Sequence, residues 1–196
     1  MSTILFGGSF DPVHLGHIQA AEFALNTVGA KRVLFIPSAR PFNKAEYMAC
    51  AQDRLAMLEK ALMRYPWAHI CLYEIQDSLQ GQPSAVHYTI DTLHFLQKHN
   101  LVEQYPYLLI GDDLLPSFHT WKEYRALAQE TKILIATRKE QLAQVPDFSY
   151  TLLSNAPYTH ASSLIRQFIA AGKAYRKAVP KEVYQYIERQ KLYRTF

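Results

Sequence analysis

The sequence predicts an α/β fold in which a doubly wound parallel sheet carries helices on both faces. Short apolar runs, rich in β-branched and aromatic residues, have the length of strands that are buried on both sides. Longer amphipathic stretches with helical spacing lie between these runs. Strands that alternate with helices in this way are typical of βαβ units, and therefore of a parallel sheet.

The predicted strands recur along most of the chain. The five runs are 4–6, 32–36, 70–75, 107–110 and 132–136, and 151–154 has the length of one more short strand. Because each run is short and almost wholly apolar, we expect these strands in the middle of the sheet.

The predicted helices fill the intervals between the strands. In the first of them, Ile18, Ala21, Leu25 and Val28 recur at helical spacing on one face. The helical segments are 15–28, 53–65, 88–98, a short one near 121–127, 163–171 and 180–193, and surface loops are predicted at 78–84 and 140–148. Arg54 is expected to form an ion pair at the surface or within its own helix.

The domain organisation is predicted to be simple. No repeat, low-complexity tract or Gly/Ser linker divides the chain, so we expect one domain over 1–196. A chain of this length buries about 70% of its unfolded surface, which is enough for one core. We expect residues from about 160 to 196 to form a small helical subregion against the sheet.

The charge distribution argues against nucleic acid as a partner. The net charge is +4. The first 159 residues carry a net charge of −2, whereas residues 160–196 carry +6. A chain-wide polybasic surface is therefore excluded, while a local anion site near the C-terminus is not.

Other features bear on the compartment. No apolar run approaches the ~20 residues that a membrane span needs. The chain has only two cysteines and no basic region before its first apolar run. We therefore expect a cytoplasmic protein that does not enter a membrane.

The segment 7–17, Gly-Gly-Ser-Phe-Asp-Pro-Val-His-Leu-Gly-His, joins the first predicted strand to the first predicted helix. In a parallel sheet, this is the edge where ligands bind. Gly7 and Gly8 are predicted to form a sharp turn and to admit a ligand close to the backbone. Asp11 and Pro12 are typical of a helix start, as an N-cap candidate followed by a proline.

The same segment predicts a phosphate site. A helix N-terminus offers N–H groups and a partial positive charge to an anion. His14 and His17 are three residues apart, so their imidazoles are expected on one face of the first turn. Gly16 between them would leave the surface open for a flat adenine ring. A zinc site would need further ligands that the neighbouring residues do not offer.

This segment resembles the signature of the nucleotidyltransferase superfamily with an HxGH motif, here His14 to His17. The order and spacing of later segments are similar to those of bacterial nicotinate mononucleotide adenylyltransferases, over residues 3–193. The resemblance implies a Rossmann-like fold. It also implies transfer of the adenylyl group of ATP to nicotinate mononucleotide, giving deamido-NAD and pyrophosphate in NAD biosynthesis.

On the ATP side, residues 160–166 resemble the family motif Ile-Ser-x-Thr-x-Ile-Arg. Hydroxyl groups at a helix N-terminus, with Arg166 one turn further, would form an anion site for the β and γ phosphates. The residues that the resemblance assigns to ATP are Gly7, Gly8, Ser9, Phe10, His14, Gly16, His17, Ser162, Ser163 and Arg166.

The proline-rich segment 36–44 is suited to cover an anionic ligand. The family usually has Pro-Pro-His-Lys or Pro-Pro-His-Arg here, whereas this chain has Pro-Phe-Asn-Lys at 41–44. Lys44 can still meet a phosphate, but Asn43 offers only a neutral hydrogen bond in place of the histidine. The residues that the resemblance makes catalytic are His14, His17, Lys44 and Arg166.

On the mononucleotide side, Tyr88 and Thr89 match a family motif at a helix start, which would bind a ring carboxylate. Trp121 matches the tryptophan on which the pyridine ring stacks, although a tryptophan in the core is the alternative. The ammonium of Lys122 would favour an acidic ring over an amide. The residues assigned to the mononucleotide are Asn43, Lys44, Tyr88, Thr89, Gly111, Asp113, Trp121 and Arg138.

The reaction that the resemblance implies is an in-line attack of a phosphate oxygen on the α-phosphorus of ATP. The nucleophile is already ionised, so positioning and charge stabilisation matter more than a general base. Mg²⁺ would be held mainly by the ATP phosphates and water, with no tight protein metal site.

Two other functions remain open at this point. One is a phosphopantetheine adenylyltransferase, which has a similar first turn, and the other is a module that binds a dinucleotide without turnover. The sequence does not determine the oligomeric state, and a homo-oligomer is possible. It also leaves open the preference between nicotinate and nicotinamide mononucleotide.

Overall fold

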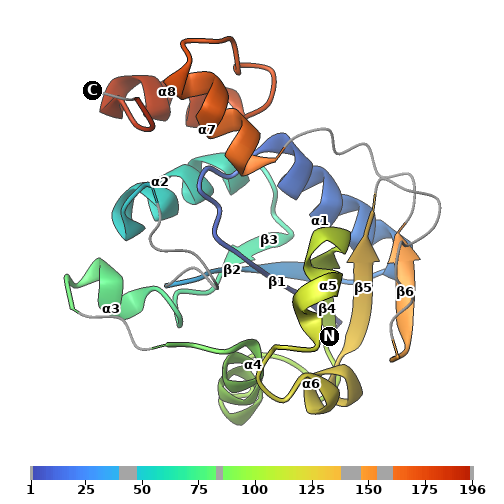
Figure 1. Cartoon of the computed structure of the whole chain (residues 1–196). Helices are drawn as coiled ribbons and strands as arrows, with labels where there is room; N and C mark the ends of the chain where they lie inside the picture. The colour runs from blue at the N-terminus through green and yellow to red at the C-terminus, as the bar shows by residue number, and fades with distance from the viewer. Residues whose placement is uncertain (1, 40–47, 83–85, 138–146, 154–160, 195–196) are drawn as a thin grey trace.

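Six parallel strands form one sheet in the computed structural model, which describes residues 2–39, 48–82, 86–137, 147–153 and 161–194 (Figure 1). The strand order is β3-β2-β1-β4-β5-β6. The strands are β1 (Thr3–Gly8), β2 (Arg32–Pro37), β3 (Ala68–Ile70), β4 (Tyr107–Gly111), β5 (Lys132–Ala136) and β6 (Tyr150–Leu153). The predicted doubly wound α/β sheet is confirmed, and the short strand expected at 151–154 is β6.

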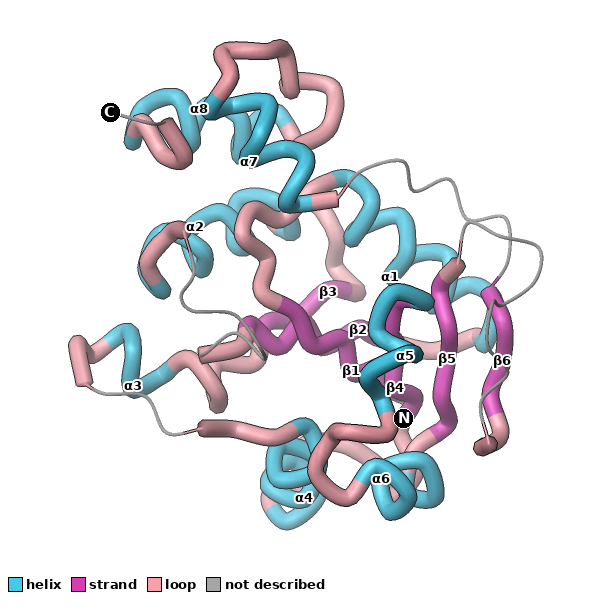
Figure 2. Tube along the Cα trace, in the orientation of Figure 1, coloured by secondary structure: helices cyan, strands magenta, loops and turns pink. Residues whose placement is uncertain are grey.

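Helices connect the strands and cover both faces of the sheet (Figure 2). They are α1 (Leu15–Val28), α2 (Ala51–Leu62), α3 (Gln76–Leu79), α4 (Thr89–Lys98), α5 (Leu115–Phe118), α6 (Tyr124–Glu130), α7 (Ser162–Ala170) and α8 (Lys181–Gln190), with a 3-10 turn at Asp112–Leu114. Helix α1 has the predicted bounds, and it ends at Gly29, whose φ of 62° is the left-handed cap that glycine adopts readily.

Two apolar clusters hold these layers together, one on each face of the sheet. The first joins buried side chains of β1 and β2 to α1 and α2, and it also contains Val183 and Ile187 of α8. The second joins the opposite face of the sheet to α4, α5 and α6. The expected C-terminal helices thus pack on the same side of the sheet as α1 and α2.

The sequence prediction was wrong over 70–75, where one strand was expected. Strand β3 ends at Ile70, and the chain then turns into α3, which lies partly in the loop predicted at 78–84. Residues 70–75 have the composition of one buried strand, but Glu74 and Ile75 are buried for different reasons. Ile75 packs at the start of α3, whereas the Glu74 carboxylate accepts a 2.7 Å hydrogen bond from Thr92 Oγ1 of α4.

The order in which strands are added to the sheet reverses between β1 and β4. The chain leaves β1 toward β2 and β3, and it later returns to the other side of β1, where it adds β4. Strands β1 and β2 pair over six residues, but β1 and β4 pair only at Ile4–Tyr107 and Leu5–Leu108. The two central strands therefore part toward their carboxyl ends, beside Gly7 and Gly111. In open α/β sheets, ligands bind outside the strand ends at such a place, the topological switch point between β1 and β4.

Burial raises the pKa of Glu74 from 4.5 to about 7, although the hydrogen bond from Thr92 opposes the shift. The folded protein therefore holds a proton between pH 4.5 and 7 that the unfolded chain has released, so this group costs stability as pH rises through that window. We expect Glu74→Gln to be more stable than wild type at pH 8, by about 2–3 kcal/mol, and equally stable at pH 4.5.

Thermal unfolding of both proteins at the two pH values tests this expectation. Comparing the variant with wild type cancels the titration of all other groups. An equal stability difference at both pH values would show that Glu74 does not titrate in this window.

Candidate functional site

Gly7 and Gly8 are the last residues of β1, not the turn that the sequence predicted. They pair with Ile36 and Pro37 of β2, and neither has a positive φ. The backbone turns at Phe10 instead, whose φ is 48° and whose side chain is fully buried. The Phe10 ring packs edge-to-face against the rings of Phe6 and His17. Any contact of this residue with a nucleotide would therefore use its backbone.

The two glycines therefore have different roles. A Cβ on Gly8 would lie 3.0 Å from the Phe10 ring, whereas a Cβ on Gly7 would meet nothing within 4 Å. Gly8 is needed for packing. Gly7 is exposed and presents bare backbone at the point where β1 and β4 part.

We expect Gly8→Ala to lower the free energy of unfolding by about 1–3 kcal/mol, because the Phe10 ring must move. Gly7→Ala should change stability by less than about 0.5 kcal/mol. Chemical denaturation of the two variants measures this contrast. Equal losses would mean that the Phe10 contact does not limit position 8.

Helix α1 begins at Leu15, as its apolar spacing predicted, and the helix-start signal at Asp11-Pro12 lies three residues too early. Its N-cap is His14, and its first residue, Leu15, donates its N–H to the Ala178 carbonyl at 3.0 Å. One of the N–H groups that we expected to bind phosphate is thus bonded to the C-terminal subregion. Gly16 follows in the first turn and is itself buried.

His14 and His17 lie on one face, as their spacing predicted, and their rings stack on each other. Their ring centroids are 3.7 Å apart and the rings are inclined by 25°. The His14 backbone N–H donates to Nδ1 of His17 at 3.2 Å, so Nδ1 is the unprotonated nitrogen of that ring.

Burial lowers the pKa of His17 from 6.5 to about 4, so the ring is neutral at pH 7. The rings of Phe6 and Phe10 lie beside it, with centroids 6.0 and 5.1 Å away, and they keep water from this part of the imidazole. With Nδ1 accepting a hydrogen bond, the one proton of the neutral ring is on Nε2. His17 is therefore fixed as a neutral hydrogen-bond donor.

The Asp11 carboxylate, expected as an N-cap, instead joins distant segments. It is 2% exposed. Its Oδ2 accepts from the Met48 N–H at 2.9 Å, and its Oδ1 accepts from the Ala49 N–H at 3.2 Å and from the Tyr193 hydroxyl at 2.7 Å. These bonds tie the β1–α1 connection to the start of α2 and to the end of the chain.

The start of α7 lies against this same connection. Ser162 Oγ donates to the Pro12 carbonyl at 3.0 Å, and Arg166 Nη1 donates to the Asp11 carbonyl at 2.6 Å. Ser163, next in the chain, is exposed. The structure thus brings the two predicted ATP motifs together, and it gives Ser162 and Arg166 a bracing contact that sequence reasoning missed.

Arg54 is buried rather than paired at the surface, so that expectation was wrong. Its side chain is 1% exposed, and its Nη1 donates to the carbonyls of Ser9 and Ser38, both at 2.9 Å. These carbonyls lie in the connections that leave β1 and β2. A buried guanidinium thereby holds two loops at the carboxyl edge of the sheet.

On the other side of the switch point, β4 ends at Gly111 and two aspartates follow. The Asp112 carboxylate accepts a 2.7 Å hydrogen bond from Thr137 at the end of β5. Asp113 is exposed and its carboxylate folds directly over Gly111, where any larger side chain would meet it. The Asp112 carboxylate is thus hydrogen-bonded within the protein, whereas the Asp113 carboxylate is accessible. Asp113 is the residue that was predicted to bind the mononucleotide.

Tyr88 and Thr89 lie at the start of α4, with Tyr88 as the N-cap and Thr89 as the first helical residue. Lys122 Nζ lies 5.3 Å from the Tyr88 ring centroid and forms a 2.7 Å ion pair with Asp91. This exposed pair brings the start of α4 beside the turn that carries Trp121. Two of the predicted mononucleotide-binding segments are therefore neighbours.

Trp121 packs against Phe118, with ring centroids 5.1 Å apart. It is only partly buried and lies at the margin of the second apolar cluster. Its indole N–H is covered, with no hydrogen-bond partner among the residues that the structure describes. The two readings of Trp121 from sequence, core packing and ring stacking, are thus compatible at this margin.

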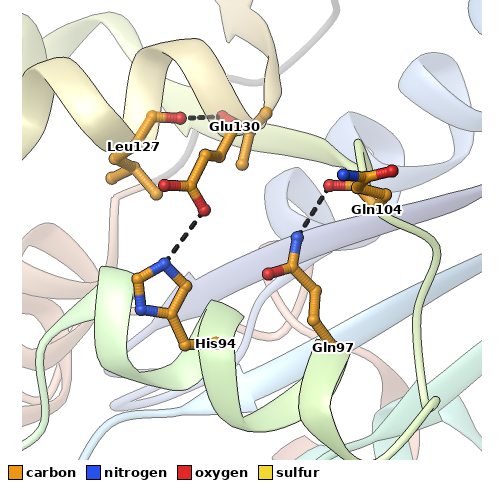
Figure 3. A network of polar contacts seen from close by, with 6 residues as sticks. His94, Gln97, Gln104, Leu127 and Glu130 are labelled. Atoms are coloured by element: carbon orange, nitrogen blue, oxygen red, sulfur yellow. Dashed lines mark hydrogen bonds and ion pairs between the residues drawn. The ribbon is translucent and has the colours of Figure 1, made fainter.

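Polar contacts join α4 to α6 and to the segment that precedes β4 (Figure 3). His94 and Glu130 form an exposed pair at 2.9 Å, and Gln97 donates to the Gln104 carbonyl at 2.7 Å. These contacts lie away from the carboxyl edge, so they support the helices on this face rather than the site.

Three predicted site residues, Asn43, Lys44 and Arg138, lie outside the described residues. In the described part of the chain, no group of three or more His, Cys, Asp or Glu side chains converges as a metal site. No described helix is both long enough and apolar enough to span a membrane. Cys50 and Cys71 are free thiols.

Comparisons with known proteins show the family of this chain. The cytidylyltransferase-like family model matches residues 5–168. A protein of Aquifex aeolicus named "Probable nicotinate-nucleotide adenylyltransferase" is 39% identical over 145 residues, covering 74% of this chain and 82% of that protein. One of the same name from Pseudomonas putida is 31% identical over an alignment of 215 residues, covering 97% and 94%.

The fold is also found among solved structures. A nicotinic acid mononucleotide adenylyltransferase of Plasmodium falciparum, complexed with NaAD, superposes with a TM-score of 0.74 at 18% identity and covers 98% of both chains. The same enzyme complexed with APC superposes with a TM-score of 0.70.

Proposed function

The chain belongs to the cytidylyltransferase-like family, and from this membership and the names of its relatives we propose that it is a nicotinate-nucleotide adenylyltransferase. It transfers the adenylyl group of ATP to nicotinate mononucleotide and so makes deamido-NAD for NAD biosynthesis. The acceptor's 5′-phosphate oxygen forms a bond to the α-phosphorus, the bond from that phosphorus to the bridging oxygen breaks, and pyrophosphate leaves.

One observation carries this proposal. The neutral His17 is fixed as a donor through Nε2, and it lies at the start of α1 beside the point where β1 and β4 part. A preorganised donor stabilises charge that grows on the α-phosphate. The acceptor phosphate is ionised near neutral pH, so the reaction needs no general base from the protein.

The remaining roles are distributed over the two sides of the switch point. Gly7 lets the nucleotide approach the backbone, and His14 and the α7 start with Ser162, Ser163 and Arg166 complete the ATP side. Asp113 accepts from a ribose hydroxyl, and the α4 start with Tyr88 and Thr89 receives the ring carboxylate beside Trp121. Lys44 and Arg138 are proposed to bind the mononucleotide, as in the family motif. Asn43 is proposed to offer a neutral hydrogen bond where the family has histidine.

Mg²⁺ is proposed to arrive with ATP. It keeps several waters and prefers phosphate oxygens to an all-protein cage, so it would neutralise charge on the leaving pyrophosphate without dedicated ligands. We also place this reaction in the cytoplasm, where the two free thiols stay reduced. Residues 1–196 are proposed to act as one domain, because the first apolar cluster contains side chains from both β1 and α8.

The experiment compares acceptors side by side with the purified protein, ATP and Mg²⁺. Nicotinate mononucleotide, nicotinamide mononucleotide and phosphopantetheine are each supplied, and pyrophosphate release and product mass are measured. We expect the highest kcat/KM with nicotinate mononucleotide. Turnover with phosphopantetheine alone would instead identify a phosphopantetheine adenylyltransferase, and binding of deamido-NAD without pyrophosphate release would identify a non-catalytic module.

A further inference from the structure

The C-terminal subregion forms several hydrogen bonds with the connection between β1 and α1. Three of these contacts involve backbone groups of 11–15, as described above for Ser162, Arg166 and Ala178. The fourth is made by a side chain near the end of the chain. The Tyr193 hydroxyl donates to Asp11 Oδ1 at 2.7 Å across 182 residues of sequence.

Tyr193 is held firmly in place. It is 7% exposed, and its hydroxyl also lies 3.9 Å from the Met57 sulfur of α2. Its φ of 64° is in the left-handed region, which a bulky residue seldom adopts. Burial and the Asp11 carboxylate raise the pKa of Tyr193 above its usual range, so the phenol remains a donor at physiological pH.

The Asp11 carboxylate leads directly to the imidazole pair. Only Pro12 and Val13 separate it from His14, and both are buried. His14 is the extended N-cap of α1, and its N–H holds Nδ1 of His17. A shift of Asp11 would therefore move His14, and with it the bond that orients His17.

We propose that Tyr193 is a positioning residue for adenylyl transfer, acting through the Asp11 carboxylate on the placement of His14 and His17. This inference rests on the proposed function. The Tyr193 hydroxyl hydrogen-bonds to the Asp11 carboxylate, and we infer that it acts on the reaction through this bond. Its hydroxyl is one of three donors that Oδ1 and Oδ2 accept, so its loss weakens the bracing of Asp11 without removing it.

A second tyrosine supplies a matched control. Tyr175 is buried to the same degree, 7% exposed, and its hydroxyl donates to the Glu188 carboxylate at 2.7 Å within the C-terminal subregion. Tyr193→Phe and Tyr175→Phe each remove one hydroxyl-to-carboxylate bond and keep the ring. Only the first bond touches the connection that carries the histidines.

We expect Tyr193→Phe to lower kcat about tenfold, with the KM for ATP changed less than twofold, at a temperature where both variants are folded. Tyr175→Phe should keep kcat within twofold while its melting temperature falls by a similar amount. Hydrogen–deuterium exchange of the peptide covering 9–17 should be faster in Tyr193→Phe alone. A kcat loss shared by both variants would reduce the Tyr193 effect to general destabilisation and overturn the proposal.

Asp11→Asn tests whether the effect of Tyr193 passes through Asp11. It keeps the shape of the side chain but weakens its bonds, and we expect the double variant Tyr193→Phe/Asp11→Asn to lose no more kcat than Asp11→Asn. Additive losses would contradict action through Asp11. If wild-type protein makes no dinucleotide, the proposed function fails, whereas unchanged exchange of 9–17 in Tyr193→Phe defeats the positioning proposal by itself.

Discussion

His17→Ala is expected to lower kcat by about 10²–10³-fold, the loss seen when one preorganised donor to a developing charge is removed. The His17 ring is neutral because burial lowers its pKa to about 4, and its Nδ1 is occupied by the His14 N–H, so Nε2–H is the donor that the variant deletes. Because this bond strengthens in the transition state, the KM for ATP should change much less than kcat.

Steady-state rates of pyrophosphate release test this expectation. His69→Ala is the matched control, because His69 is an exposed residue of the short edge strand β3 and should leave kcat unchanged. A loss of less than tenfold for His17→Ala would remove His17 from the catalytic role.

Arg54→Met is expected to give the largest loss of stability, about 3 kcal/mol. The methionine keeps the apolar stem, but the two bonds from Nη1 to the Ser9 and Ser38 carbonyls disappear, each contributing about 1.5 kcal/mol or more with a charged donor. For a chain of this length, the melting temperature should fall by about 6–12 °C.

Arg64→Met is the control for this substitution. Arg64 lies just after the C-cap of α2, the helix that carries Arg54, and its side chain is 77% exposed in a 2.8 Å pair with Glu182. An exposed ion pair contributes less than about 1 kcal/mol. Equal unfolding midpoints for the two variants would contradict the assignment of Arg54 as the clamp between the β1 and β2 connections.

Several features followed from the sequence because they depend on neighbours along the chain. Helix α1 has the predicted bounds, since its apolar spacing and Gly29 are local signals. The shared face of His14 and His17 also follows from a spacing of three residues in a helical turn. The parallel sheet follows from the alternation of strands and helices.

Other features could not be read in this way. Arg54 next to Asp53 has the pattern of a surface ion pair, yet its buried Nη1 donates to carbonyls 45 and 16 residues away. The run 70–75 is strand-like in composition, but Glu74 turns inward to Thr92. In each case, the deciding partner comes from a distant segment, and no local period encodes it.

The sequence by itself determined the order of the elements, the α/β class and the histidine motif at the first strand-to-helix connection. Only the tertiary structure decided that Asp11 braces this connection, that Gly8 serves packing, and that His17 is neutral. The physical reason is that these properties depend on burial and on bonds such as that from Tyr193, which arise only when remote segments pack and exclude water.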